Sequence, residues 1–182
     1  WTPELVKKLS GGDSLIKVRE LLEPKKVVET VATVNHIVKL TKRFNPESFI
    51  GAGWKRTEED PQTAATKEFD ISKLKLVCPL KEDEPSIGGE ERRKRLLAGP
   101  GIKLGLDAFL YFWENQNHIP EEWKKAGHIT FDGDVLVYPD GGRHVVYPYW
   151  DGGRWHWGTG WLDGGWRDHY LSAILAPVVQ HS

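Results

Sequence analysis

Short runs of aromatic and β-branched residues alternate with Asp-Gly turns along the C-terminal third of the chain. The turns stand at Asp132-Gly133, Asp140-Gly141-Gly142, Asp151-Gly152-Gly153 and Asp163-Gly164-Gly165. Runs of this kind between turn residues are typical of antiparallel strands joined by hairpins. The pattern therefore predicts strands near Ile129–Phe131, Val135–Tyr138, Arg143–Trp150, Arg154–Trp161 and Trp166–Leu171.

The turn at residues 151–153 permits two hairpin registers. A three-residue loop places Tyr149 opposite Trp155, whereas a loop of Gly152 and Gly153 alone places Trp150 opposite Trp155. We favour the first register because it forms one continuous aromatic ladder. That ladder consists of Tyr147, Tyr149, Trp155 and Trp157. The other face of the hairpin would then carry His144, Trp150 and His156.

A helical pattern precedes this region at Leu106–Asn117. Apolar residues cover nearly all of two helical turns, namely Leu106, Phe109, Leu110, Phe112 and Trp113. A helix that is apolar on most sides is buried. We therefore expect this helix to lie across the aromatic sheet, with Phe109 and Trp113 in the core.

Helical spacing also recurs in the N-terminal part, over Ser14–Leu22 and from Pro24 to about Arg43. The expected fold class is α+β, with a helical N-terminal part and a C-terminal twisted antiparallel β-meander packed on a buried helix. The expected domains are a helical extension at residues 1–49 and an α+β domain at residues 50–182.

The central segment carries a basic run, Arg92-Arg93-Lys94-Arg95, within an expected helix at Gly89–Leu97. We favour a solvated helix face over a nucleic-acid contact, and we expect residues 81–101 to be mobile. Cys78 lies in an apolar run, which favours a buried, inert thiol. Leu74–Leu80 is expected to form a strand or an extended arm.

Composition narrows the classes of partner. The net charge of the 182 residues is −1, which disfavours nucleic acid and anionic membranes. From His128 onward three arginines stand against six aspartates, so this part is acidic. No apolar stretch approaches the ~20 residues of a membrane span, and no signal peptide is visible. We therefore expect a cytoplasmic protein without a membrane contact.

Candidate catalytic residues are few. Glu114 and His118 stand four apart and could share a helix face as a metal or acid–base pair. We favour a solvated helix end, because no third partner follows from the sequence. His144, His156 and His169 lie in different expected strands and could converge, but chance placement on a polar sheet face is favoured. We expect no metal and no cofactor.

A set of motifs resembles a family of uncharacterised bacterial proteins from uncultivated lineages. The set comprises Ile50-Gly51-Ala52-Gly53-Trp54, Trp113-Glu114-Asn115-Gln116, Ile119-Pro120-Glu121-Glu122-Trp123, Phe131-Asp132-Gly133 and the Trp-rich C-terminal region. The resemblance covers roughly residues 50–175. It implies a bacterial origin, and it carries no activity, cofactor or site residue, because none is assigned in that family.

The abundance of aromatic residues decides the functional expectation. Five of the nine tryptophans fall between Trp150 and Trp166. Exposed aromatic side chains on a sheet can hold a peptide or a sugar ring. We therefore expect a non-catalytic binding or protein-interaction module, with a protein or peptide favoured over carbohydrate. The expected binding residues are Trp150, Arg154, His156 and Trp166. The alternative is a small metal-dependent or hydrolytic enzyme that uses Glu114 and His118.

Overall fold

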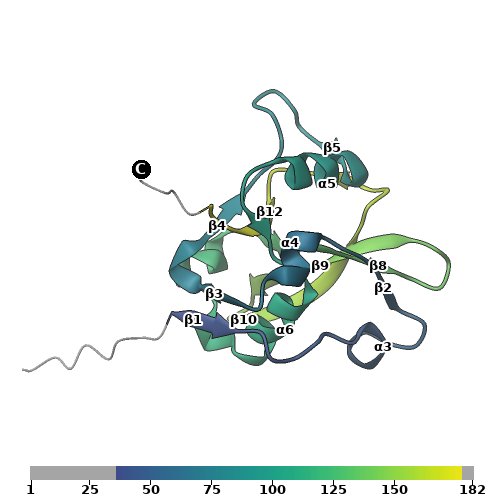
Figure 1. Cartoon of the computed structure of the whole chain (residues 1–182). Helices are drawn as coiled ribbons and strands as arrows, with labels where there is room; N and C mark the ends of the chain where they lie inside the picture. Colours follow the sequence, from purple (N-terminus) through teal and green to yellow (C-terminus); the bar gives the residue numbers. More distant parts are fainter. Residues whose placement is uncertain (1–35, 178–182) are drawn as a thin grey trace, which may run out of the picture. The chain divides into compact units, whose positions relative to one another are not determined.

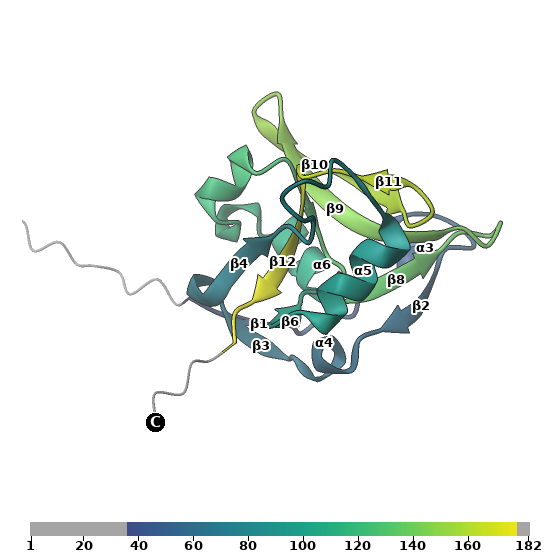
Figure 2. The same ribbon diagram turned by 90° about the horizontal axis from the view of Figure 1, so that it is seen from above.

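An eight-stranded mixed sheet forms the centre of the fold in the computed structural model, which describes residues 36–177 (Figures 1 and 2). Its strands lie in the order β2 (Lys55–Glu59), β8 (Asp134–Val137), β9 (Arg143–Asp151), β7 (His128–Thr130), β12 (Tyr170–Leu175) and β4 (Leu74–Val77). Strand β10 (Arg154–Trp161) pairs with β9, and β6 (Ile102–Lys103) pairs with β12. Two small sheets join β1 (Ile37–Lys39) to β3 (Glu68–Asp70) and β5 (Ile87–Gly88) to β11 (Gly165–Trp166).

This topology corrects the predicted fold class. The sheet is not a C-terminal antiparallel meander, because β12 runs parallel to β7 and three of its strands precede α6 in the chain. The predicted helix from Pro24 to about Arg43 is wrong where the structure describes it, because Ile37–Lys39 is a strand. The rest of the predicted helical N-terminal part lies outside the described residues. The domain boundary at residues 49 and 50 stays a prediction.

Helices cover both faces of the sheet. Helix α5 (Gly89–Ala98) lies on one side of the sheet and α6 (Leu106–Glu114) on the other (Figure 1). Shorter helices are α3 (Pro46–Phe49), α4 (Pro61–Ala65), η1 (Ile71–Lys73), η2 (Gln116–His118) and η3 (Glu121–Lys125). Neighbouring side chains in a strand point to opposite faces. Accordingly Val146 joins the core under α6, whereas Val145 joins a second cluster with Trp166.

The central helix confirms the predicted burial. Phe109 is 1% exposed, and its ring lies 5.7 Å from that of Phe131 and 6.0 Å from that of Phe44. Trp113 is only partly buried at the edge of the same cluster. The helix ends at Glu114 instead of Asn117.

The hairpin of β9 and β10 has the register that we did not favour. Trp155 pairs with Trp150, and the loop consists of Gly152 and Gly153, whose φ angles are 55° and 82°. Two positive φ angles form the turn that matches the twist of the flanking strands, and glycine adopts them without strain. Trp150, Trp155 and Trp157 therefore share the face that α6 covers, while Tyr147, Tyr149 and His156 lie on the other face.

The basic run is also not a solvated face. Arg92 is fully buried, with its Nη1 2.5 Å from Asp132 Oδ1 and its guanidinium carbon 4.7 Å from the centroid of the Trp166 ring. Arg93 Nη1 lies 3.1 Å from Glu58 Oε2. Two consecutive residues of α5 thus fix the helix to the sheet. Cys78, predicted to be buried, is exposed just beyond β4.

Candidate functional site

Four aromatic rings gather at one corner of the sheet, on the face that α6 covers elsewhere. Each ring comes from a different strand or its flank. Trp54 precedes β2, Tyr138 follows β8, His144 lies in β9 and Trp161 ends β10. They line a depression of about 700 Å³, together with Asp140, Gly141, Gly142 and Asp163. We call these eight residues the aromatic pocket.

Strand register brings the four rings together. Lys55 pairs with Val137, which places Trp54 beside Tyr138. His144 pairs with Trp161 across the hairpin, and cross-strand partners point to the same face. The loop that carries Trp54 can approach the β8–β9 turn only because residue 53 is glycine. Its φ is 83°, and a Cβ there would lie 2.5 Å from Pro139 Cγ.

Trp54 stands at steep angles to two of the other rings. Trp54 lies 5.0 Å from Tyr138 at an interplanar angle of 55°, and 5.1 Å from His144 at 69°. Gly142 lies between the groups, because a Cβ on it would be 3.3 Å from His144 Nε2 and 3.5 Å from Trp161 Nε1. Trp54, Tyr138 and His144 therefore pack against one another at different angles and do not form one flat platform.

The pocket is open to solvent and apolar. Within residues 36–177 the exposed large hydrophobic side chains are Ile37, Tyr138 and Trp161, and the last two line this pocket. Tyr138 is 43% and Trp161 54% exposed. Apolar surface held open in a concave site marks a contact site more strongly than the same area scattered over the protein.

Charge in the pocket is negative. Asp140 Oδ1 accepts a hydrogen bond of 2.8 Å from the Gly142 amide, which leaves its second oxygen unused in the part that the structure describes. Asp163 is exposed at the rim. Burial lowers the pKa of His144, against the opposing effect of Asp140, so that the ring is neutral at pH 7. No lysine or arginine belongs to the described lining.

The predicted binding residues lie elsewhere. Trp150 is half-buried under Lys124, whose Nζ lies 4.4 Å from the ring centroid. Arg154 is exposed and pairs with Asp151 in the register, and its Nε donates to His156 Nε2 at 3.2 Å. Trp166 is 3% exposed and donates its indole N–H to the Trp161 carbonyl, so in this structure it is a core residue.

The predicted catalytic pair has separate partners. Glu114 forms an ion pair of 2.8 Å with Lys42, and His118 Nδ1 lies 2.6 Å from the Tyr111 hydroxyl. His144, His156 and His169 lie in different aromatic clusters: His144 beside Trp54, His156 stacked on Tyr149, and His169 near His128. Among residues 36–177 no group of three or more His, Cys, Asp or Glu side chains is arranged to hold a metal ion.

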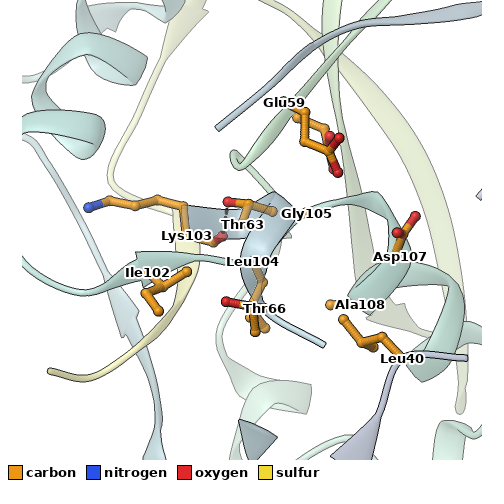
Figure 3. Close-up of a pocket in the computed structure, with 11 residues that line it drawn as sticks. Leu40, Glu59, Thr63, Thr66, Ile102, Lys103, Leu104, Gly105, Asp107 and Ala108 are labelled. Atoms are coloured by element: carbon orange, nitrogen blue, oxygen red, sulfur yellow. Dashed lines mark hydrogen bonds between the residues drawn. The ribbon is translucent and has the colours of Figure 1, made fainter. Parts of the chain in front are cut away.

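A second, much smaller cavity lies at the start of α6 (Figure 3). Its carboxylates are engaged: Asp134 Oδ2 accepts from the Leu106 amide at 2.6 Å, and Asp107 Oδ1 accepts from Arg56 at 2.6 Å. Lys103 points its ammonium away from them, toward the Gly99 and Gly101 carbonyls. The cavity holds about 10 Å³, which is the space of one water molecule. The hydrogen bonds of these carboxylates hold the start of the helix, and the cavity is too small to admit a substrate.

Comparison with known proteins does not assign the chain. No family model matches it, and neither a curated protein nor a solved structure is significantly similar to it. The resemblance to the uncharacterised bacterial family therefore stays an expectation. No helix in the described part is long and apolar enough to cross a membrane.

Sequence reasoning missed all four rings of the aromatic pocket as a group. No sequence pattern connects Trp54 with residues 138–161. The missing element is β2, Lys55-Arg56-Thr57-Glu58-Glu59, which is too charged to be recognised as a strand. The hairpin register of Trp161 and His144 was the available signal, and it depended on the turn that we assigned incorrectly.

Proposed function

We propose that this domain is a non-catalytic binding module that takes a side chain of a protein or peptide partner into the aromatic pocket. The observation that carries the proposal is the convergence of Trp54, Tyr138, His144 and Trp161 on one open depression. An exposed Trp and Tyr would bury a large apolar area on contact, at about 25 cal/mol per Å².

Shape favours a peptide over carbohydrate. A sugar ring stacks on one broad aromatic face, whereas Trp54 lies at 55° to Tyr138 and 69° to His144, so these three rings do not share one plane. A projecting side chain fits between rings that stand as walls. Such pockets give specificity to an otherwise shallow peptide contact.

The test is a selection of ligands from a random displayed peptide library with the full chain. The matched baits are the wild type, Trp54→Ala and Trp161→Ala. We expect peptides with a common motif to be enriched by the wild type and lost with both variants. Circular dichroism and thermal unfolding of each bait establish that the variants are folded.

Two results would contradict the proposal. Enrichment that is unchanged in both variants would place the binding surface elsewhere. Absence of a common motif, together with ring-dependent binding on a glycan array, would establish carbohydrate as the ligand class instead.

A further inference from the structure

The charges around the aromatic pocket select for a cation. Asp140 and Asp163 line it, no lysine or arginine does so among the described residues, and the neutral His144 ring adds no positive charge. Within residues 36–177 the Asp163 carboxylate makes no hydrogen bond or ion pair. Two aspartates beside apolar rings would repel an acidic ligand and attract a basic one.

Ring geometry points to the same class of ligand. The faces of aromatic rings carry negative potential, so a cation is attracted when it lies within about 6 Å of a ring centroid. Tyr138 and His144 lie at 55° and 69° to Trp54, so the rings that line the depression offer surfaces of different orientation to a compact group. A planar guanidinium prefers parallel stacking and a two-pronged carboxylate contact. Asp140 is not free for that two-pronged contact, since its Oδ1 already binds the Gly142 amide.

The same molecule shows how its other tryptophans are used. The Trp150 ring is covered by Lys124 at 4.4 Å, and the Trp166 ring by Arg92 at 4.7 Å. Both cations belong to the chain itself. The aromatic pocket has comparable rings and a more negative surrounding, but no cation of the described chain covers it. A cation from a ligand would form at this pocket the same cation–π contact that Lys124 and Arg92 form with Trp150 and Trp166.

We propose that the aromatic pocket binds a methylated lysine side chain of a partner protein. This inference rests on the proposed function and names its ligand. Methylation keeps the positive charge of lysine. It also makes the ammonium bulkier and less strongly hydrated, which suits a pocket whose walls are rings and whose carboxylates stand at the rim. Quaternary ammonium groups are the ligands that aromatic cages recognise best.

The experiment titrates the full chain with three peptides that differ at one side chain. One carries trimethyl-lysine, the second unmodified lysine, and the third a neutral analogue in which carbon replaces the ammonium nitrogen. Binding is measured by tryptophan fluorescence and calorimetry. We expect trimethyl-lysine to bind about tenfold more tightly than the neutral analogue, because the two have the same shape and differ only in charge. Unmodified lysine should bind more weakly than trimethyl-lysine, and added salt should weaken both.

Variants separate the rings from the carboxylates. Trp161→Ala should lower the affinity for trimethyl-lysine about tenfold, and Trp161→Phe should restore part of it, because indole is the strongest cation partner of the three aromatic side chains. Asp140→Asn and Asp163→Asn should each weaken binding severalfold. Asp151→Asn removes the same charge from an exposed aspartate at the other end of the hairpin and should leave affinity unchanged.

Equal affinity for trimethyl-lysine and its neutral analogue would overturn the inference, and so would tighter binding of unmodified lysine. Absence of binding by all three peptides would overturn it as well. The proposed function fails separately. If the library selection yields ring-dependent peptides without basic residues, the binding module stands and the cationic ligand falls.

Discussion

The β9–β10 hairpin carries a pair of rings on the same sheet face at each of its two ends. At the turn end, Trp150 and Trp155 lie 5.4 Å apart and Trp155 is 5% exposed. At the open end, His144 pairs with Trp161, which is 54% exposed. Both pairs lie on the same two strands and on the same face of the sheet, and in both the two residues are cross-strand partners. The difference lies in what covers the rings: η3, with Lys124, covers the turn end.

This difference separates stabilising aromatics from available ones. A buried ring contributes to folding through the apolar area that it removes from water, and its loss leaves a cavity. An exposed ring contributes little to folding but retains that free energy for a partner. The abundance of tryptophan in this chain therefore has two explanations, and position along one hairpin decides between them.

The largest expected effect is the loss of stability at the turn end. Trp155→Ala should lower the free energy of unfolding by about 3–5 kcal/mol, the range for truncation of a buried aromatic side chain. Urea denaturation followed by circular dichroism measures it. A loss below about 1 kcal/mol would show that the covering helices do not bury this ring as described.

The sequence was sufficient for the buried helix and for most C-terminal strands. Phe109 and its apolar neighbours predict burial because a helix apolar on most sides has no stable solvent face. The parallel pairing of β12 with β7 was out of reach. Strands that are joined through distant parts of the chain leave no local pattern, and His128–Thr130 reads like any short strand. The same holds for β4 and β6, which join the sheet from the first part of the described chain.

The pocket was less predictable than the fold, for two physical reasons. The first is the register of the β9–β10 hairpin, which the glycine turn sets. We predicted the wrong register because we favoured the continuous aromatic ladder. The φ angles of Gly152 and Gly153, 55° and 82°, are those of a two-residue turn, and that turn fixes the register. The second reason is strand β2. Its side chains are charged and form ion pairs, such as Arg56 Nη2 with Asp107 at 2.6 Å, so its sequence lacks the alternation of apolar and polar residues that identifies a strand.

The second prediction concerns the covered part of the face, where Asp134 holds the start of α6. Burial raises the pKa of Asp134 to about 6, against the lowering effects of Arg56 and the Leu106 amide. A raised pKa means that the folded state favours the protonated carboxyl. Its contribution to stability is therefore complete below about pH 4 and is lost as the pH rises through 6. Two units correspond to about 3 kcal/mol.

Asp134→Asn tests this sign, because an amide oxygen can still accept from Leu106 and carries no charge. Between pH 4.5 and 7.5 the unfolding free energy of the wild type should fall relative to the variant, by about 2 kcal/mol. The difference between the two profiles removes the contributions of other titrating groups. Parallel profiles would mean that the carboxylate is accommodated in its charged form.

The third prediction removes the cation from the turn end. Lys124→Met keeps most of the side-chain stem over Trp150 but deletes the charge, and with it the exposed ion pair to Glu121. An exposed ion pair adds little, so the change should cost about 0.5–1 kcal/mol, the value of a partly exposed cation–π contact. Thermal unfolding at low and high salt measures it. Lys125→Met is the matched control, since Lys125 is exposed and takes no part in that contact. Equal losses in the two variants would assign the effect to net charge alone.

The smallest expected effect on stability belongs to the open end. Trp161→Ala should change the free energy of unfolding by no more than about 0.5 kcal/mol, the usual range for an exposed position, while it abolishes most of the binding. The indole can be removed without a cavity, because the buried Trp166 bonds to the Trp161 carbonyl and not to its side chain. Urea denaturation beside the Trp155→Ala measurement gives the contrast directly. If the two variants lose similar stability, the rings of the aromatic pocket contribute to the folded core, and they are not available for a ligand.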